Sequence, residues 1–239
     1  CLQHSAEISR QRDQVALAID HARNSLSREL YANINLAQGL IDLVRVQGGM
    51  QQDQFDAMAR ELTSHSDLIR NVALAPGNVI RFIYPLEGNE KALGLDYLKT
   101  PDQSDAVLRG IAEQRTVVAG PVRLVQGGTA IIGRTPVFLQ GTGGVARAKE
   151  YWGMASTVIT FESLIKEARL DRAPANLRIA LRGRDGSGAG GEVFWGDASV
   201  LASSPVTMDI ALPSGSWQIA AVPVNGWPTF RPFASASFL

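Results

Sequence analysis

The stretch IRNVALAPGNVIRFIY, residues 69–84, decides the fold of the chain. Residues 69–74 and 79–84 are rich in apolar and β-branched side chains, which favour strands. The residues between them, APGN, are the types that form tight turns. Upstream of this stretch the apolar residues follow a helical period, and from here on the period is two. The stretch therefore predicts an antiparallel hairpin at the start of a sheet.

Upstream of the hairpin, the sequence predicts a long helix over residues 6–46 and a short one over 53–62. Apolar residues recur in steps of three and four, and Gly48-Gly49 ends the pattern. A helix of about 40 residues is about 60 Å long, longer than a typical domain is wide. Its apolar stripe is therefore expected to pack against a second copy of the chain. The alternative is that a later part of the same chain covers the stripe.

Downstream of the hairpin, the order of elements is that of an α+β protein with antiparallel sheets. A helix is expected at 103–113, and Pro174 separates two groups of strands that are linked by a helix at 161–170. The strands are expected near residues 116–119, 122–125, 129–135 and 151–160, and then near 177–182, 192–195, 206–212 and 217–222. The chain divides into a dimerisation helix (1–50), a first domain (51–161) and a connecting helix with a second, smaller domain (162–239).

The composition excludes several classes of function. Basic and acidic residues number 23 each, without a block of like charges, so nucleic acid is not an expected partner. The uncharged stretch 210–230 contains three prolines, which argues against a membrane span. The three histidines are scattered, so their spacing does not predict a metal site. The sequence contains neither a GxSxG nor a Walker A motif, so an enzyme is not expected. Residues 186–191 match GxGxxG, but a strand follows, so a hairpin loop is predicted instead of a cofactor site.

Short motifs within residues 55–164 are more informative. They are IRFIYP at 80–85, GLDY at 94–97, AGPV at 119–122, QGG at 126–128 and RTPVF at 134–138. Together they resemble the CHASE family, the extracytoplasmic sensory domains of histidine kinases and cyclases. The resemblance implies a long dimerising helix, a membrane-distal PAS-like domain that holds a ligand, and a membrane-proximal PAS-like domain. It also implies the periplasmic part of an inner-membrane receptor, of histidine kinase or diguanylate cyclase type, with flanking transmembrane helices.

The resemblance also implies where a ligand binds. In family members that bind cytokinins, an Asp of a short helix bonds the adenine edge. The matching position is Gln103, a neutral amide, so a cytokinin is not the expected ligand. A threonine position on a pocket strand is Arg134, and Ala119 and Val125 fall at other pocket positions.

Arg134 gives the sharpest prediction. An arginine within the apolar strand 130–137 is suited to bind a carboxylate or phosphate, because its planar fork can bond two oxygens. The alternative is an internal ion pair with Glu87, Glu90 or Asp96. The candidate ligand-binding residues are Arg134, Gln103, Ala119, Val125, Tyr97, Tyr84, Phe82 and Ile132, of which Phe82 and Ile132 have core packing as their ordinary role.

The expected function is therefore that of a non-catalytic sensor domain. It binds a small molecule, with an anion favoured by Arg134, and forms a homodimer through the N-terminal helix. The alternative is a structural dimerisation and protein-interaction module whose pocket is collapsed. A hydrolase built on Asp96, Asp105 or His65 is the weaker alternative.

Overall fold

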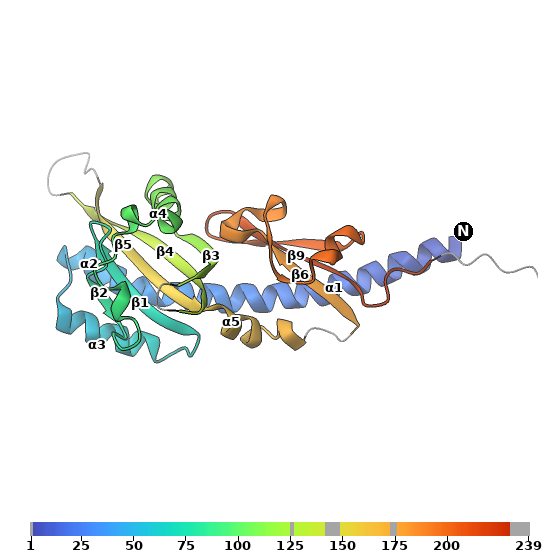
Figure 1. Cartoon of the computed structure of the whole chain (residues 1–239), viewed down its shortest axis with the longest axis horizontal. Coiled ribbons are helices and arrows are strands. Elements are labelled where there is room, and N and C mark those ends of the chain that lie inside the picture. The colour runs from blue at the N-terminus through green and yellow to red at the C-terminus, as the bar shows by residue number, and fades with distance from the viewer. Residues whose placement is uncertain (1, 125–126, 142–148, 173–175, 230–239) are drawn as a thin grey trace, which may run out of the picture.

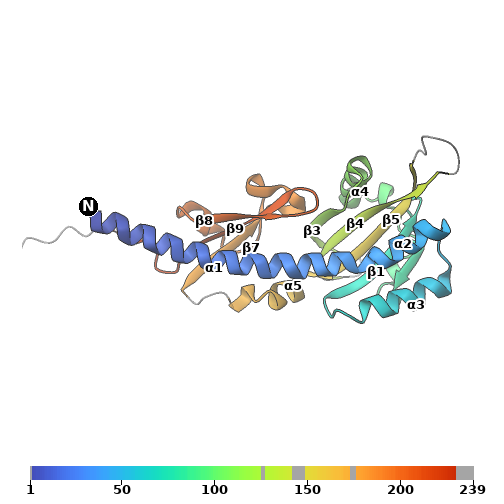
Figure 2. The ribbon, with the colours of Figure 1, turned by 180° about the vertical axis from the view of Figure 1, so that it is seen from behind.

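The computed structural model describes residues 2–124, 127–141, 149–172 and 176–229. Helix α1 (Leu2–Ile34), the 3-10 turn η1 (Asn35–Ala37) and helix α2 (Gln38–Gln47) follow one another and run along the length of the molecule (Figure 2). Gly48 ends α2 in the left-handed region (φ 78°), which glycine adopts without strain. The predicted long helix and its stop are thus confirmed, with one 3-10 turn inside it.

The first sheet has five strands in the order β2-β1-β5-β4-β3, all paired antiparallel. Its strands are β1 (Ile69–Pro76), β2 (Phe82–Tyr84), β3 (Val117–Arg123), β4 (Thr129–Gln140) and β5 (Lys149–Thr160). The pair Leu74 and Phe82 confirms the predicted hairpin. The two strands expected at 116–119 and 122–125 are one strand, β3, with a register shift after Ala119.

Helices cover both faces of the first sheet (Figure 1). Helix α4 (Pro101–Glu113) lies over β3 and β4 on one face. On the other face lie α2 and α3 (Gln52–Thr63), which contact β4 and the pair β1–β2 respectively. Because helices bury both faces of this sheet, apolar side chains occur on both faces. The sequence pattern therefore does not show which face a given side chain lies on.

The second sheet has four strands in the order β7-β6-β9-β8, again antiparallel. Helix α5 (Phe161–Glu167) and the turn η4 (Leu170–Arg172) lead from the first sheet to the second. The strands are β6 (Leu177–Arg182), β7 (Val193–Gly196), β8 (Val206–Ala211) and β9 (Ser216–Pro223). Residues 186–191 lie in the connection between the paired strands β6 and β7, as predicted. The fold is α+β, a long helix followed by two antiparallel sheets.

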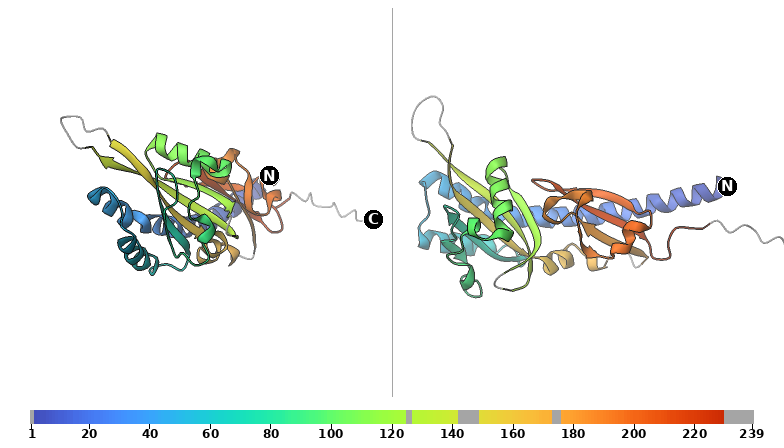
Figure 3. Two further views of the ribbon diagram at one scale, coloured as in Figure 1. Left: turned by 60° about the vertical axis from the view of Figure 1, so that its left-hand side comes forward. Right: turned by 45° about the horizontal axis from the view of Figure 1, so that its top comes forward.

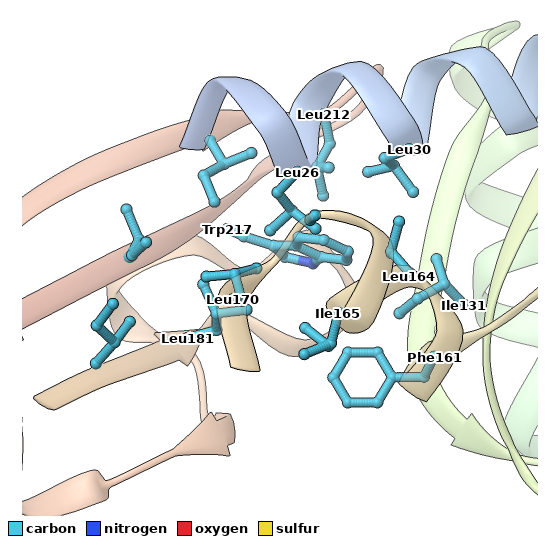
Figure 4. Packing of buried hydrophobic residues seen from close by; sticks show 14 of the residues in the cluster. Leu26, Leu30, Ile131, Phe161, Leu164, Ile165, Leu170, Leu181, Leu212 and Trp217 are labelled. Atoms are coloured by element: carbon cyan, nitrogen blue, oxygen red, sulfur yellow. The ribbon is translucent and has the colours of Figure 1, made fainter. Parts of the chain in front are cut away.

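The apolar stripe of α1 is covered by the chain itself. Ile19, Leu26 and Leu30 have no exposed surface and belong to one cluster with residues of α5 and the second sheet, including Trp217 (Figure 4). Both sheets lie along the same helix, and from Val15 onward its apolar stripe is covered by a later part of the chain, while the first turns of α1 project beyond the second sheet (Figure 1). No helix among the described residues has the length and hydropathy to cross a membrane.

Candidate functional site

A small cavity lies against the face of the first sheet that α4 covers, with the segment between β2 and α4 forming further walls. Its free volume is about 30 Å³, enough for a water molecule but not for an organic ligand. Strand register explains which side chains reach it: Arg134 pairs with Ser156, and Ser156 pairs with Ala73, so all three point to one face. The cavity is lined by Asn71, Ala73, Ile80, Ile83, Ala92, Leu95, Tyr97, Gln103, Leu124, Ile132, Arg134, Ser156 and Val158.

Arg134 is the charged group of this cavity, and it is almost completely buried, with 1% of its surface exposed. Its Nη2 donates a hydrogen bond to Oε1 of Gln103 on α4, and its Cζ lies 5.1 Å from the ring centroid of Tyr97. Its Nε has no hydrogen-bond partner among the described residues. Burial lowers the pKa of the Arg134 guanidinium from its ordinary value, because removal from water disfavours the charged form.

The predicted alternative, an ion pair for Arg134, is not formed. Within the described ranges no carboxylate lies within 4.0 Å of its guanidinium. Asp96 instead accepts a hydrogen bond from the Leu98 amide, and Glu90 accepts one from the Gly88 amide. A buried charge without a counter-ion costs several kcal/mol in proteins, of the order of the solvation it loses. Arg134 is therefore a buried cation that forms no ion pair among the described residues, although the charge of Asp185 acts on it from farther away.

Neutral polar groups complete the cavity. The hydroxyl oxygens of Tyr97 and Ser156 lie 2.9 Å apart in a hydrogen bond that either can donate. Nδ2 of Asn71 donates to Oδ1 of Asn89 at 3.0 Å. Side chains of these types can each donate and accept hydrogen bonds, so they suit a ligand with hydroxyl or carbonyl groups.

The structure brings together four of the predicted site residues: Arg134, Gln103, Tyr97 and Ile132 all line the cavity. Ala119 packs beside Ile132 in a small apolar cluster without forming part of the wall. Val125 lies outside the described residues. The roles of these residues in ligand binding stay a prediction.

Phe82 and Tyr84 were predicted to line the pocket, and the structure places them on the opposite face of the sheet. Phe82 packs against Phe55 of α3, with ring centroids 5.5 Å apart, and the Tyr84 ring lies 6.0 Å from the Arg60 guanidinium. Successive residues of a strand point to opposite faces, so Ile83 between them is the residue that reaches the cavity.

Sequence reasoning missed Asn71 and Ser156. The signal for them was weaker than for Arg134, since each is a neutral polar residue next to a second polar one, Arg70 in β1 and Thr157 in β5. Both are buried, with 1% and 2% of their surface exposed. Ile80, Ile83, Leu95 and Val158 were missed because an apolar residue at such a position is usually core.

Comparisons with known proteins give the family and the fold of the chain. The family model of the CHASE domain matches residues 28–195. No curated protein matches the chain. Among solved structures, an extracellular ligand binding receptor from Desulfohalobium retbaense is 14% identical with a TM-score of 0.65; the match covers 87% of this chain and 40% of that one.

Two sensory domains of similar length match over most of both chains. The ligand binding domain of the Pseudomonas aeruginosa amino acid chemoreceptor PctB, in complex with L-Arg, is 11% identical with a TM-score of 0.63, covering 90% of this chain and 96% of that one. The sensory domain of the Campylobacter jejuni chemoreceptor Tlp3 is 9% identical with a TM-score of 0.60, covering 93% and 97%. At these identities the similarity shows a shared fold.

Proposed function

This chain belongs to the CHASE domain family, and from this premise we propose that it senses a small anionic molecule bound at Arg134 in the cavity beneath α4. The observation that carries the proposal is the buried Arg134 guanidinium, which faces the cavity and has no carboxylate partner in the described part of the chain. An anion would supply the missing counter-charge. The similar chemoreceptor domain in complex with L-Arg supports the view that this fold holds small polar ligands.

Binding requires the cavity to open. Its free volume of about 30 Å³ is about a tenth of what ligand pockets usually provide, about 300 Å³ or more. One contact between the sheet and α4 across the cavity is the hydrogen bond that Arg134 donates to Gln103. An anion that replaces Oε1 of Gln103 on the guanidinium would release this side chain and let α4 move away from the sheet. A ligand that binds the open form then shifts the population toward it.

Helix α4 also contacts the second unit, which is the second sheet with its connecting segments. Arg109 donates from Nη2 to the carbonyl oxygen of Asp185 at 3.0 Å, and Ser214 donates from Oγ to Oε2 of Glu113 at 2.6 Å. The start of the helix therefore holds Gln103 at the cavity, while its later turns are bonded to connections of the second sheet. We propose that α4 carries the signal from the cavity to the second unit.

In this proposal, residues 1–50 form the dimerisation helix, 51–161 the membrane-distal ligand-binding domain and 162–239 the membrane-proximal part. Membrane helices would flank the chain, with the domain in the periplasm. Arg12 of α1 lies 5.0 Å from the Trp227 ring centroid, so the early part of α1 and the segment after β9 lie at one end of the molecule (Figure 3). A homodimer would use the uncovered face of α1, where Leu17 is 74% exposed.

The alternative function, a structural module with a collapsed pocket, is supported by the small volume of the cavity. A purely structural core would gain from pairing the buried cation or replacing it with an apolar residue, and the described residues do neither. The two functions differ in one measurable property, the response of the protein to small anions.

A thermal-shift screen of the whole chain against organic acids, amino acids, purines and phosphates tests the proposal. We expect at least one anion to raise the melting temperature in a saturable way, because a ligand at 100 times its Kd adds about 2.7 kcal/mol to the stability of the native state. Exposed Arg123 on β3 provides the matched control: Arg123→Met should keep the shift, and Arg134→Met should lose it. No shift with any compound would support the structural module.

A further inference from the structure

The described lining of the cavity contains a positive charge and no negative charge. Of its lining side chains, Arg134 is charged and positive, and Asn71, Tyr97, Gln103 and Ser156 are polar and neutral. The other described lining residues are apolar, and neither Asp nor Glu is among them. A ligand therefore meets one positive charge, hydroxyl and amide groups, and aliphatic walls.

Two carboxylates near the cavity, Asp96 and Asp185, are bonded to other groups. Asp96 accepts from the Leu98 amide and lies 3.9 Å from the Lys99 ammonium. Asp185, whose charge acts on Arg134 from the second unit, accepts a hydrogen bond from the Gly120 amide at 2.6 Å. An ammonium group in the cavity would thus find neutral acceptors alone within the described lining.

The aromatic ring that could hold an ammonium group is also occupied. Cations bind well over the face of a tyrosine ring within about 6 Å of its centroid. The Arg134 guanidinium already lies over the Tyr97 ring at 5.1 Å. A second cation at this ring would lie beside the first one, in a buried site where repulsion between like charges is strong.

Resting on the proposed function, we infer that the ligand is a monocarboxylate without an ammonium group, of the 2-hydroxy acid or 2-oxo acid type. Its carboxylate would accept hydrogen bonds from the Arg134 guanidinium, including the unpartnered Nε. Its hydroxyl or oxo oxygen would bond to the Tyr97 and Ser156 hydroxyls. Its short aliphatic or aromatic part would lie against Ile80, Ile83, Leu95, Ile132 and Val158.

This selectivity follows from the cost of burying charges. A carboxylate at Arg134 neutralises the cavity, whereas an α-amino acid brings its own positive charge and leaves a net excess of one. Burying an ammonium group without a carboxylate partner costs several kcal/mol. The hydroxy acid should therefore bind much more tightly than the amino acid with the same carbon skeleton.

Calorimetric titration of the whole chain with matched pairs tests this inference. The pairs are lactate and L-alanine, 2-hydroxy-3-methylbutanoate and L-valine, and 3-phenyllactate and L-phenylalanine, each with the uncharged amide of the hydroxy acid as a third compound. We expect at least one hydroxy acid to bind at least about 10-fold more tightly than its amino acid, the amide not to bind, and Arg134→Met to remove the binding.

An isosteric variant keeps the test independent of stability. Asn71→Asp places a carboxylate of the same size in the cavity wall, with the loss of the hydrogen bond that Asn71 donates to Asn89. It should move the ratio of affinities toward the amino acid, which a loss of stability would not do.

The outcomes separate the two proposals. An amino acid that binds as tightly as its hydroxy acid, and depends on Arg134, overturns the ligand class and leaves the sensing function in place. The ligand class is also overturned if the compound found in the wider screen is a phosphate or a purine and no pair binds. If neither the pairs nor the wider screen gives an Arg134-dependent ligand, both proposals fail.

Discussion

Arg134→Met is expected to abolish the binding of small anions and to raise the melting temperature of the ligand-free protein. The binding loss should be about 100-fold or more, as for other truncated partners of a buried charge pair. The gain in stability arises because methionine fills a similar space without a buried, uncompensated charge. Replacing buried ionic groups by apolar ones of similar volume is neutral or stabilises by about 1–4 kcal/mol.

The two effects must be measured on the same variant, by calorimetry and by thermal unfolding without ligand. Arg123→Met removes a charge from the surface of the same sheet and should change neither property much. A less stable Arg134→Met protein that still binds would mean that the guanidinium serves the fold and not the ligand. Arg134→Lys should keep the charge but not the fork, and so bind weakly.

Trp217→Ala is expected to cost about 3–5 kcal/mol of the free energy of unfolding, the range for large aromatic truncations in cores. Trp217 on β9 has no exposed surface, and its ring centroid is 5.2 Å from that of Phe194. Figure 4 shows it between the second sheet, α5 and the leucines of α1, so it lies where three parts of the chain meet.

The comparison with Trp217→Phe identifies the source of this cost. The indole Nε1 of Trp217 has no hydrogen-bond partner in the ranges that the structure describes, so phenylalanine loses volume but no hydrogen bond. We expect Trp217→Phe to cost clearly less than Trp217→Ala in urea unfolding followed by circular dichroism. Half-buried Trp227, whose Nε1 bonds to the Ser203 carbonyl, is the control for tryptophan removal. A Trp217→Ala protein within about 1 kcal/mol of the parent would contradict the packing of the second sheet on α1 as a main source of stability.

Sequence alone predicts those parts of this fold that depend on local pattern. The helical period of residues 6–46 and the turn chemistry of 75–78 act over a few neighbours, and the predicted helix and hairpin are found. What covers the α1 stripe is not local. The side chains that cover it, among them Trp217 and Leu170, lie more than a hundred residues downstream. Their local sequence does not indicate that they pack against α1.

In the candidate site, too, features of a single strand are predictable from sequence, and contacts between distant segments are not. Arg134 is predictable because burying a charged side chain in an apolar strand is costly, so its presence there indicates a function. The side of the sheet that Phe82 and Tyr84 face is not predictable, because helices bury both faces and alternation alone fits either choice. Which polar residues join Arg134 depends on strand order, which places Ser156 beside Arg134 and Ala73.

If Arg134 is a buried cation whose partner is a bound anion, nitrogen-15 NMR of its side-chain Nε–H is the most direct test of that pairing. The resonance is assigned by its loss in Arg134→Met, and the titrant is the anion with the largest thermal shift. We predict a saturable downfield movement as Nε–H gains an acceptor, with the Arg123 resonance unchanged. An Arg134 resonance that does not move while the anion binds would contradict this pairing.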